Sequence, residues 1–301
     1  MRLFGKRRFG ALAFAVLVIA WGSSFSVVKI GLEDAPPVLF VGGRTLVAGV
    51  LMTAVASAWG GALNFRRDWR VFGFLAVFNV ALFVGFQTFA LLYLPSGTAA
   101  VLIYLQPILV GIFAWLFLGE SLTPTKVFGL LLGFAGIVAV SSAGLLGAPG
   151  DVTPVGVACG VASALFWALG TVGFKKYEAR VSTLWAVAVP FLAGGVALSA
   201  LGFLLESPSD ISWTGPLISS VLYSALVGTG LAWLLFFGLV RAGEASRVAS
   251  YIFVVPLAAV VIGAVLLDEG LGPPLIVGAA LVVSGIYLVN RTPRPAKKPS
   301  G

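Results

Sequence analysis

The sequence contains no histidine and only one cysteine, Cys159, among its 301 residues. A lone thiol forms no disulfide within the chain, and thiolate zinc sites and histidine-based metal sites or catalysis need residues that are missing. We therefore expect no metal site and no cofactor, and most enzyme chemistry is excluded.

Charged residues are also scarce, at 10% of the chain, while 59% of the residues are hydrophobic and the mean hydropathy is +1.07. A soluble domain carries about a quarter charged residues, so this chain has too few charges to coat a water-soluble globule of its size. Most of its outer surface is expected to face a lipid bilayer. The net charge of +8 would suggest a nucleic-acid partner for a soluble protein, but here it indicates basic cytoplasmic loops, and we expect no nucleic-acid partner.

Long uncharged hydrophobic runs are abundant. They cover residues 9–28, 45–65, 71–119, 127–150, 152–174, 181–205, 211–240, 248–267 and 270–290. Because about 20 helical residues cross a hydrocarbon core of about 30 Å, the run 71–119 holds two spans, separated at Pro95, Ser96 and Gly97. The sequence thus predicts an all-α integral membrane protein with ten transmembrane helices. The first run follows basic residues, as in a signal peptide, but shows no evident small-residue cleavage site, so we expect it to be retained as the first helix.

The basic residues predict the orientation. If both termini are cytoplasmic, 17 of the 19 Lys and Arg residues fall on that face, which leaves Lys29 near the outer face and Arg44 within the second span. Residues 1–9 then form a basic cytoplasmic N-terminus, and residues 291–301 form a basic, disordered cytoplasmic tail.

The sequence also carries an internal duplication. A shift of 149 residues places Pro107, Glu120, Leu122, Pro124, Gly129, Gly136 and Ile137 on identical residues, and a shift of 146 places Trp21 on Trp167. We assign the copies to residues 10–148 and 149–290, with five spans each. Because five is odd, the second copy enters the membrane upside down, with Glu120 in a cytoplasmic loop and Glu269 in an outer loop. Inverted-topology repeats are typical of transporters that open a central site to each face in turn.

Several of these residues form a recognisable pattern. It comprises Trp21-Gly22-Ser23-Ser24-Phe25 with Lys29, Pro36-Pro37 before Arg44, and Pro107 followed by Gly119-Glu120 and Leu122-Thr123-Pro124. Over roughly residues 10–290 the chain resembles the drug/metabolite transporter superfamily, in its EamA-type ten-helix branch. The resemblance implies an inner-membrane, multi-pass carrier, often an exporter of amino acids or related metabolites. The second copy departs from the pattern, with Asp268 in place of Gly119 and Gly272 in place of Thr123.

Charged and polar side chains inside the spans are the candidate solute contacts, because unpaired polar groups are costly in hydrocarbon. Arg44 either binds a carboxylate or other anion or is a structural arginine that bonds helix-end carbonyls or reaches outward. Asn79, Phe83 and Gln87 recur at intervals of four, so they form either a cavity wall or an interhelical hydrogen-bonding face. Ser24 is either a solute contact or a packing residue.

Four aromatic residues are further candidates. Trp21 and Trp167 lie deep in corresponding spans and would frame an apolar pocket from opposite halves. Tyr104 and Tyr251 lie near the middles of the fourth and ninth spans, where a hydroxyl needs a partner.

Matched prolines and glycines are expected to be structural. Pro107 and Pro256 each remove a backbone hydrogen bond within a span. These matched kinks either act as hinges, which we expect, or only shape the cavity. The fifth and tenth helices carry spaced glycines that allow close approach, which predicts either a packing face or a homodimer face. These glycines are Gly129, Gly133, Gly136, Gly278 and Gly285.

No Asp, Glu or His lies in the middle of a span, which argues against proton coupling and against cationic cargo. The sequence therefore favours a neutral, zwitterionic or anionic small solute that moves by facilitated diffusion or exchange. A multidrug or organic-cation exporter and a non-transporting membrane assembly protein remain alternatives. An intramembrane enzyme would need a nucleophile, a metal cluster or paired acids at one depth, and none is present.

Overall fold

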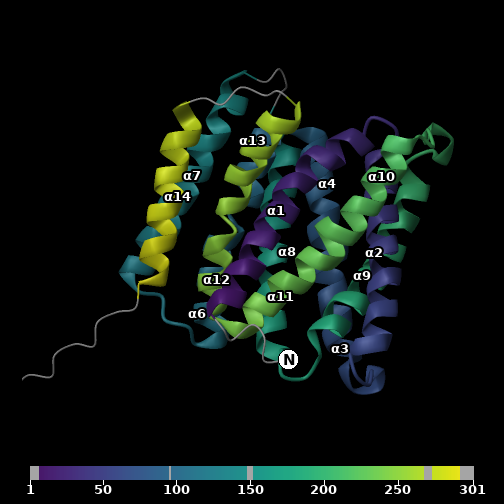
Figure 1. The fold of residues 1–301 in the computed structure, drawn as a ribbon, viewed down its shortest axis with the longest axis horizontal. Helices are drawn as coiled ribbons and strands as arrows, with labels where there is room; N and C mark the ends of the chain where they lie inside the picture. Colours follow the sequence, from purple (N-terminus) through teal and green to yellow (C-terminus); the bar gives the residue numbers. More distant parts are fainter. Residues whose placement is uncertain (1–6, 95, 148–151, 268–272, 292–301) are drawn as a thin grey trace, which may run out of the picture.

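The computed structural model describes residues 7–94, 96–147, 152–267 and 273–291, and all regular structure in these ranges is helical (Figure 1). Ten helical stretches there are long and apolar enough to cross a membrane, which confirms the predicted number of spans. The first half contains α1 (Arg7–Gly31), α2 (Pro37–Trp59), α3 (Phe65–Leu75), η2 (Ala76–Leu82), α4 (Phe83–Tyr93), α5 (Ser96–Ile103), α6 (Gln106–Leu118) and α7 (Pro124–Gly147). The second half contains α8 (Pro154–Tyr177), α9 (Thr183–Leu205), η3 (Pro208–Asp210), α10 (Gly215–Tyr223), η4 (Ser224–Leu231), α11 (Ala232–Ala242), α12 (Ala245–Tyr251), α13 (Val254–Leu267) and α14 (Pro273–Asn290). Pro95, Asp268, Glu269 and Gly272 lie outside the described residues.

Helices of the two halves pair reciprocally. The second span of one half packs against the second span of the other, as α2 on α9, and the fifth spans pair likewise, as α7 on α14. The first span of each half packs against the third and fourth spans of the other: α1 contacts α10, η4, α11 and α13, and α8 contacts η2, α4, α5 and α6. Each contact therefore has a counterpart in which the halves are exchanged, as in the isologous interface of a two-fold dimer.

Glycines bring the paired helices close together. A Cβ atom at Gly129 of α7 would lie 2.8 Å from the carbonyl oxygen of Gly285 in α14, and one at Gly136 would lie 2.7 Å from that of Gly278. These glycines therefore form a packing face within one chain, which is one of the two roles expected from their spacing. A homodimer would have to use another surface.

Two spans in each half are irregular at corresponding places. The third span continues through a π-helical segment, η2, and the eighth through η4; a shift of 149 residues places η2 on residues 225–231, inside η4. The fourth span breaks at Tyr104 and Leu105, and the ninth breaks at Ile252 and Phe253. The half-helices α6 and α13 thus begin just before the matched prolines Pro107 and Pro256, so each proline lies in a first turn, where no helical partner is lost. Motion at these breaks stays a prediction.

Tyr251 of α12 links the first and last helices at one end of the bundle. The ring of Tyr251 lies 5.1 Å from that of Phe14, near the beginning of α1, and its hydroxyl donates to Oδ1 of Asn290, at the end of α14. Helix α1 therefore begins at the end of the bundle where α14 finishes (Figure 1), as an even number of spans requires.

Candidate functional site

Aromatic rings from both halves fill the region where α1, α4, α8 and α11 meet. We call Trp21, Phe83, Trp167, Trp233 and Phe236 the central aromatic cluster. The ring centroids of Trp21 and Trp167 are 5.7 Å apart in an edge-to-face arrangement, and Phe83 stacks on Trp167 at 4.8 Å. Trp233 lies 6.0 Å from both Trp21 and Phe83. The structure thus brings together the two tryptophans that the sequence placed in opposite halves.

A hydrogen bond from Trp21 explains how one member of the cluster is held. Its indole Nε1 donates to the carbonyl oxygen of Gly228, in η4, at 3.0 Å. This acceptor lies in a π-helical segment, a kind of helix irregularity that is frequent at functional sites. The irregular helix of one half therefore positions a side chain of the other half.

Two cluster members were not among the sequence candidates. Trp233 lies eight residues before Arg241, just as Trp21 lies eight residues before Lys29. Its distance from the end of the span would therefore also have made Trp233 a candidate. Phe236 carries no comparable signal, because phenylalanine is abundant in the chain and most phenylalanines in a lipid-facing protein contact lipid.

The two candidate tyrosines and Ser24 have different surroundings. Tyr104 is buried in the turn between α5 and α6, with its ring 6.5 Å from that of Trp167. Tyr251 lies outside the cluster, at the end of the bundle where α14 finishes. The hydroxyl of Ser24 donates to the carbonyl oxygen of Ala20 in its own helix at 2.5 Å, so it already has a hydrogen-bond partner.

The predicted polar stripe of the third span divides between the interior and a partly exposed position. Phe83 belongs to the cluster, and Asn79 is 1% exposed with its amide directly against α8, where a Cβ atom at Gly170 would lie 2.0 Å from its Oδ1. Neither amide atom of Asn79 has a hydrogen-bond partner within the described structure. Gln87 is only half-buried.

Gln106, which the sequence analysis did not select, is fully buried at the start of α6, and both atoms of its amide lack a partner in the part of the chain that the structure describes. The indole Nε1 of Trp167 likewise has no hydrogen-bond partner among the described residues. The sequence signal that could have identified Gln106 is a polar residue immediately before the matched Pro107.

Arg44 is partly buried in α2. Gly42 and Gly49 of this helix contact α9 through backbone atoms of Ser199 and Leu192. At about 100° per residue, Arg44 points about 160° away from that contact. Its Nε has no hydrogen-bond partner among the described residues, so the guanidinium keeps a donor for another group.

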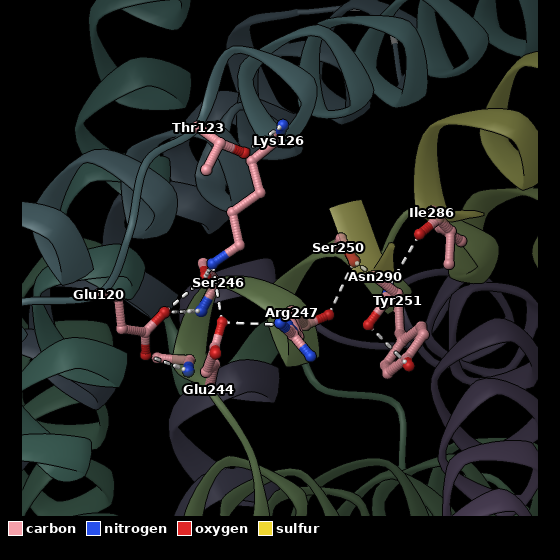
Figure 2. A network of polar contacts seen from close by, with 11 residues as sticks. Glu120, Thr123, Lys126, Glu244, Ser246, Arg247, Ser250, Tyr251, Ile286 and Asn290 are labelled. Carbon is pink, nitrogen blue, oxygen red and sulfur yellow. Dashed lines mark hydrogen bonds and ion pairs between the residues drawn. The ribbon is translucent and has the colours of Figure 1, made fainter. Parts of the chain in front are cut away.

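A polar network joins the halves at the ends of α6 and α12 (Figure 2). The Glu120 carboxylate accepts hydrogen bonds from the backbone N–H groups of Ala245 and Ser246, at 2.6 and 3.1 Å, and so caps α12. Lys126, which is 4% exposed, donates to Glu244 at 2.7 Å and to Oγ of Ser246 at 3.1 Å. The sequence predicts a loop position for Glu120, but this contact does not follow from the sequence.

Glu244 titrates in a mixed environment, since it also forms an ion pair with Arg247 at 3.0 Å. Burial alone would raise the pKa of Glu244. The hydrogen bond from Lys126 and the positive charges of Lys126 and Arg247 outweigh burial and hold this pKa below its usual value.

Carboxylates recur at this interface. Glu206, at the end of α9, caps α2 of the other half by accepting from the N–H groups of Val38 and Leu39 at 2.9 and 2.7 Å.

Next to Glu120, an open pocket of about 690 Å³ is bounded by the ends of α6 and α8 and by the loop before α12. Its lining residues are Phe117, Leu118, Glu120, Lys175, Lys176, Ala242, Gly243 and Glu244. Across the described ranges, no three His, Cys, Asp or Glu side chains are grouped as metal ligands.

The model of the EamA-like transporter family matches the chain twice, over residues 8–142 and 154–291. The chain belongs to the EamA-like transporter family. It is therefore a multi-pass membrane transporter of the drug/metabolite transporter superfamily, as its resemblance implied.

Individual relatives agree with this family. The Bacillus subtilis protein YvbV, described as an uncharacterized transporter, is 43% identical over 95% of this chain and 93% of its own length. YedA of Escherichia coli K12, described as an uncharacterized inner membrane transporter, is 30% identical over 94% of this chain and 90% of its own length. A probable amino-acid metabolite efflux pump of the same strain is 26% identical over 94% of this chain and 95% of its own length. One crystal structure, at 22% identity, superposes with a TM-score of 0.81 over 95% of this chain and 97% of that chain, and so shares the fold.

Proposed function

We propose that this transporter is an inner-membrane carrier that exports amino acids or related zwitterionic or anionic metabolites by alternating access. The central aromatic cluster carries the proposal. Its rings come from α1 and α4 of one half and from α8 and α11 of the other. Tilting one half against the other would separate these rings and open the region between them to one face at a time.

An inverted repeat is part of the proposal. Five candidate spans in each half, the reciprocal pairing of helices and the two separate family matches support it. With the basic residues on the cytoplasmic side, both termini are cytoplasmic, and the Glu120 network joins the two halves at that face.

The solute class and the direction of transport rest on two observations. The E. coli relative described as a probable amino-acid metabolite efflux pump supports export of amino-acid metabolites. Arg44, deep in the second span, supplies a positive charge for a carboxylate, whose planar geometry suits a guanidinium.

Flux through purified protein tests the proposal. Liposomes that contain the protein and are loaded with one unlabelled amino acid should accumulate the labelled amino acid by exchange, and an excess of unlabelled compound should saturate this uptake. Protein-free liposomes are the control. Flux confined to lipophilic cations such as tetraphenylphosphonium would contradict the solute class, and the absence of any solute flux would contradict the carrier itself.

Export needs a test in cells. Overproduction should increase the rate at which preloaded cells release the amino acid that the liposomes identify, and it should raise tolerance to a toxic analogue of that amino acid. Faster uptake in place of faster release would contradict the direction.

A further inference from the structure

Helix α12 is the shortest α-helix in the part of the chain that the structure describes, at seven residues, and it joins the two halves. It follows the loop at Gly243 and Glu244 and ends at the break of the ninth span, at Ile252 and Phe253. In the first half it packs mainly against α6. Hinges in proteins lie in loops and at the ends of helices, so α12 has a candidate hinge at each end.

Small side chains form the contact between α12 and α6, which we call the α6–α12 seam. Ala245 and Ala249, one turn apart on α12, are completely buried and belong to one cluster with Val110 and Ala114 of α6. Stabilisation by burial follows the nonpolar area removed from water, and an alanine side chain offers little of this area. Burial alone therefore holds the seam weakly.

Polar groups hold the seam at the end where α12 begins (Figure 2). The Glu120 carboxylate, just after α6, accepts from the backbone N–H groups of Ala245 and Ser246 and from the Ser246 hydroxyl. Lys126, in the first turn of α7, donates to Glu244 at 2.7 Å and to Oγ of Ser246 at 3.1 Å. Each of these bonds joins one half of the chain to the other. We call Glu120, Lys126, Glu244 and Ser246 the latch.

The latch borders an open pocket. Glu120 and Glu244 both line the pocket of about 690 Å³ at the ends of α6 and α8, and the loop before α12 forms one of its walls. Polar groups next to water can exchange a protein partner for water at a small net cost in free energy. The latch can therefore open and close reversibly, and with cytoplasmic termini it does so at the cytoplasmic face.

Other contacts between the halves are built for permanence. Gly49 of α2 meets the backbone of Leu192 in α9, and Gly202 of α9 meets the backbone of Leu39 in α2. Gly129 and Gly136 of α7 meet the backbone of α14 in the same way. Backbones that touch along whole helices cannot part without losing extensive packing. The α6–α12 seam, with small side chains and a polar latch, is the better place for the halves to separate.

We propose that the α6–α12 seam is the cytoplasmic gate of the carrier and that the latch holds this gate shut. The inference rests on the proposed carrier function and assigns the place at which solute enters from the cytoplasm. In the structure the gate is closed. Opening moves α12 away from α6, releases Glu120 from the N–H groups of α12, and exposes Val110 to the pocket.

Reaction of a cysteine within the seam tests the gate. Val110→Cys is made in a Cys159→Ala background, and because Val110 is completely buried, the new thiol is protected while the gate is closed. Inside-out membrane vesicles present the cytoplasmic face to a membrane-impermeant maleimide. Glu120→Ala should raise the labelling rate about fivefold, since losing a helix cap of typical strength shifts a closed–open equilibrium by about that factor. Lys126→Met, which removes the ammonium and keeps a long side chain, should raise the rate as well.

Glu206→Ala is the matched control. Glu206 also accepts two backbone N–H bonds across the halves, at the start of α2, but it lies outside the α6–α12 seam. This variant loses a cap of the same kind, and we expect it to label Val110→Cys at the rate of the unmodified background.

Labelling also connects the seam with transport. A maleimide attached to Val110→Cys prevents α12 from returning to α6, so the fully labelled protein in liposomes should lose most of its amino-acid exchange. The unlabelled Val110→Cys protein is the reference for this flux.

Three outcomes overturn the gate. They are an unchanged labelling rate in both Glu120→Ala and Lys126→Met, an equal rise in Glu206→Ala, and full exchange after complete labelling. In each case the unlabelled protein still exchanges amino acids, so the proposed function stands. A wild type without solute exchange contradicts the proposed function, and the gate with it.

Discussion

Arg44 places a positive charge within a hydrophobic span, at a cost of about 2.5–3.5 kcal/mol for a central position. Its partly buried guanidinium retains an unpaired Nε in the described structure and points away from the contact between α2 and α9. Packing between these two helices therefore does not account for the arginine. A carboxylate on the solute would pair with it in a fork geometry that a lysine does not reproduce.

Replacing Arg44 should impair transport more than folding. We expect Arg44→Gln to lower amino-acid flux in liposomes by about tenfold or more, and Arg44→Lys to lose much of the activity although it keeps the charge. Arg70→Gln is the control, because Arg70 is exposed and lies over the ring of Trp69 at 5.4 Å. Wild-type flux in Arg44→Gln would exclude a role in anchoring the solute.

Glu244 should make stability depend on pH in the acidic range. Its pKa in the folded protein is lowered, so the ionised carboxylate stabilises the fold above the unfolded pKa of about 4.3, and this contribution is lost as the pH falls through the folded pKa. Because the side chain is 40% exposed, water screens the pairs. At about pH 7, Glu244→Gln should lower the Tm by only about 1–3 °C.

The pH series of the two proteins checks this contribution. The Tm difference between wild type and Glu244→Gln should shrink as the pH falls below about 4, and in a Lys126→Met background it should be smaller at every pH. A difference that stays constant with pH would show that ionisation of Glu244 is not its source.

The sequence identified those cluster residues that lie far from the ends of their spans and also match between the two copies of the duplication. Trp21 and Trp167 were found because they match between the copies and lie far from the span ends. Gln106 was missed because its burial depends on α8 and α12, which pack on α6 from the other half of the chain. Likewise, Ser24 donates to its own helix and Tyr251 lies far along the bundle, and neither fact follows from span position alone.

At the scale of elements, hydropathy predicted the ten spans because lipid demands about 20 apolar residues for each. It did not predict the π segments η2 and η4, whose residues are as apolar as those of regular helices. The prolines marked the breaks before α6 and α13 to within a few residues, since a helix that begins just before a proline places it in the first turn, where no helical hydrogen bond is lost. The caps at α12 and α2 were not predictable, because each carboxylate comes from the other half of the sequence.

Removing one of these caps should destabilise the contact between halves. Glu120→Ala leaves two N–H groups at the start of α12 without their acceptor and should lower the Tm by about 1–4 °C. Glu206→Ala removes the same two-bond pattern at α2 and should cost a similar amount, whereas Glu33→Ala, at an exposed loop position, should cost little. A Tm unchanged in Glu120→Ala would show that the cap contributes nothing to stability.

At the scale of the whole molecule, the reciprocal pairing of helices and the matched irregularities describe two similar halves. When each half of a duplicated protein has an odd number of spans, equivalent loops of the two halves lie on opposite faces of the membrane. That arrangement gives the two end states of a carrier similar energies, because each half takes the role of the other when the accessible face changes. A parallel duplication would make the two faces structurally unrelated.

Labelling of equivalent loops distinguishes these arrangements. Ala62 lies between the second and third spans of the first half, Ser209 lies between the second and third spans of the second half, and both are exposed. In a Cys159→Ala background, Ala62→Cys should react with a membrane-impermeant maleimide only after cells are permeabilised, and Ser209→Cys should react in intact cells. The background protein without cysteine controls for non-specific labelling. Reaction of both positions from the same side would contradict the inverted repeat, and with it the expectation that motion at the breaks before α6 and α13 exchanges the two faces.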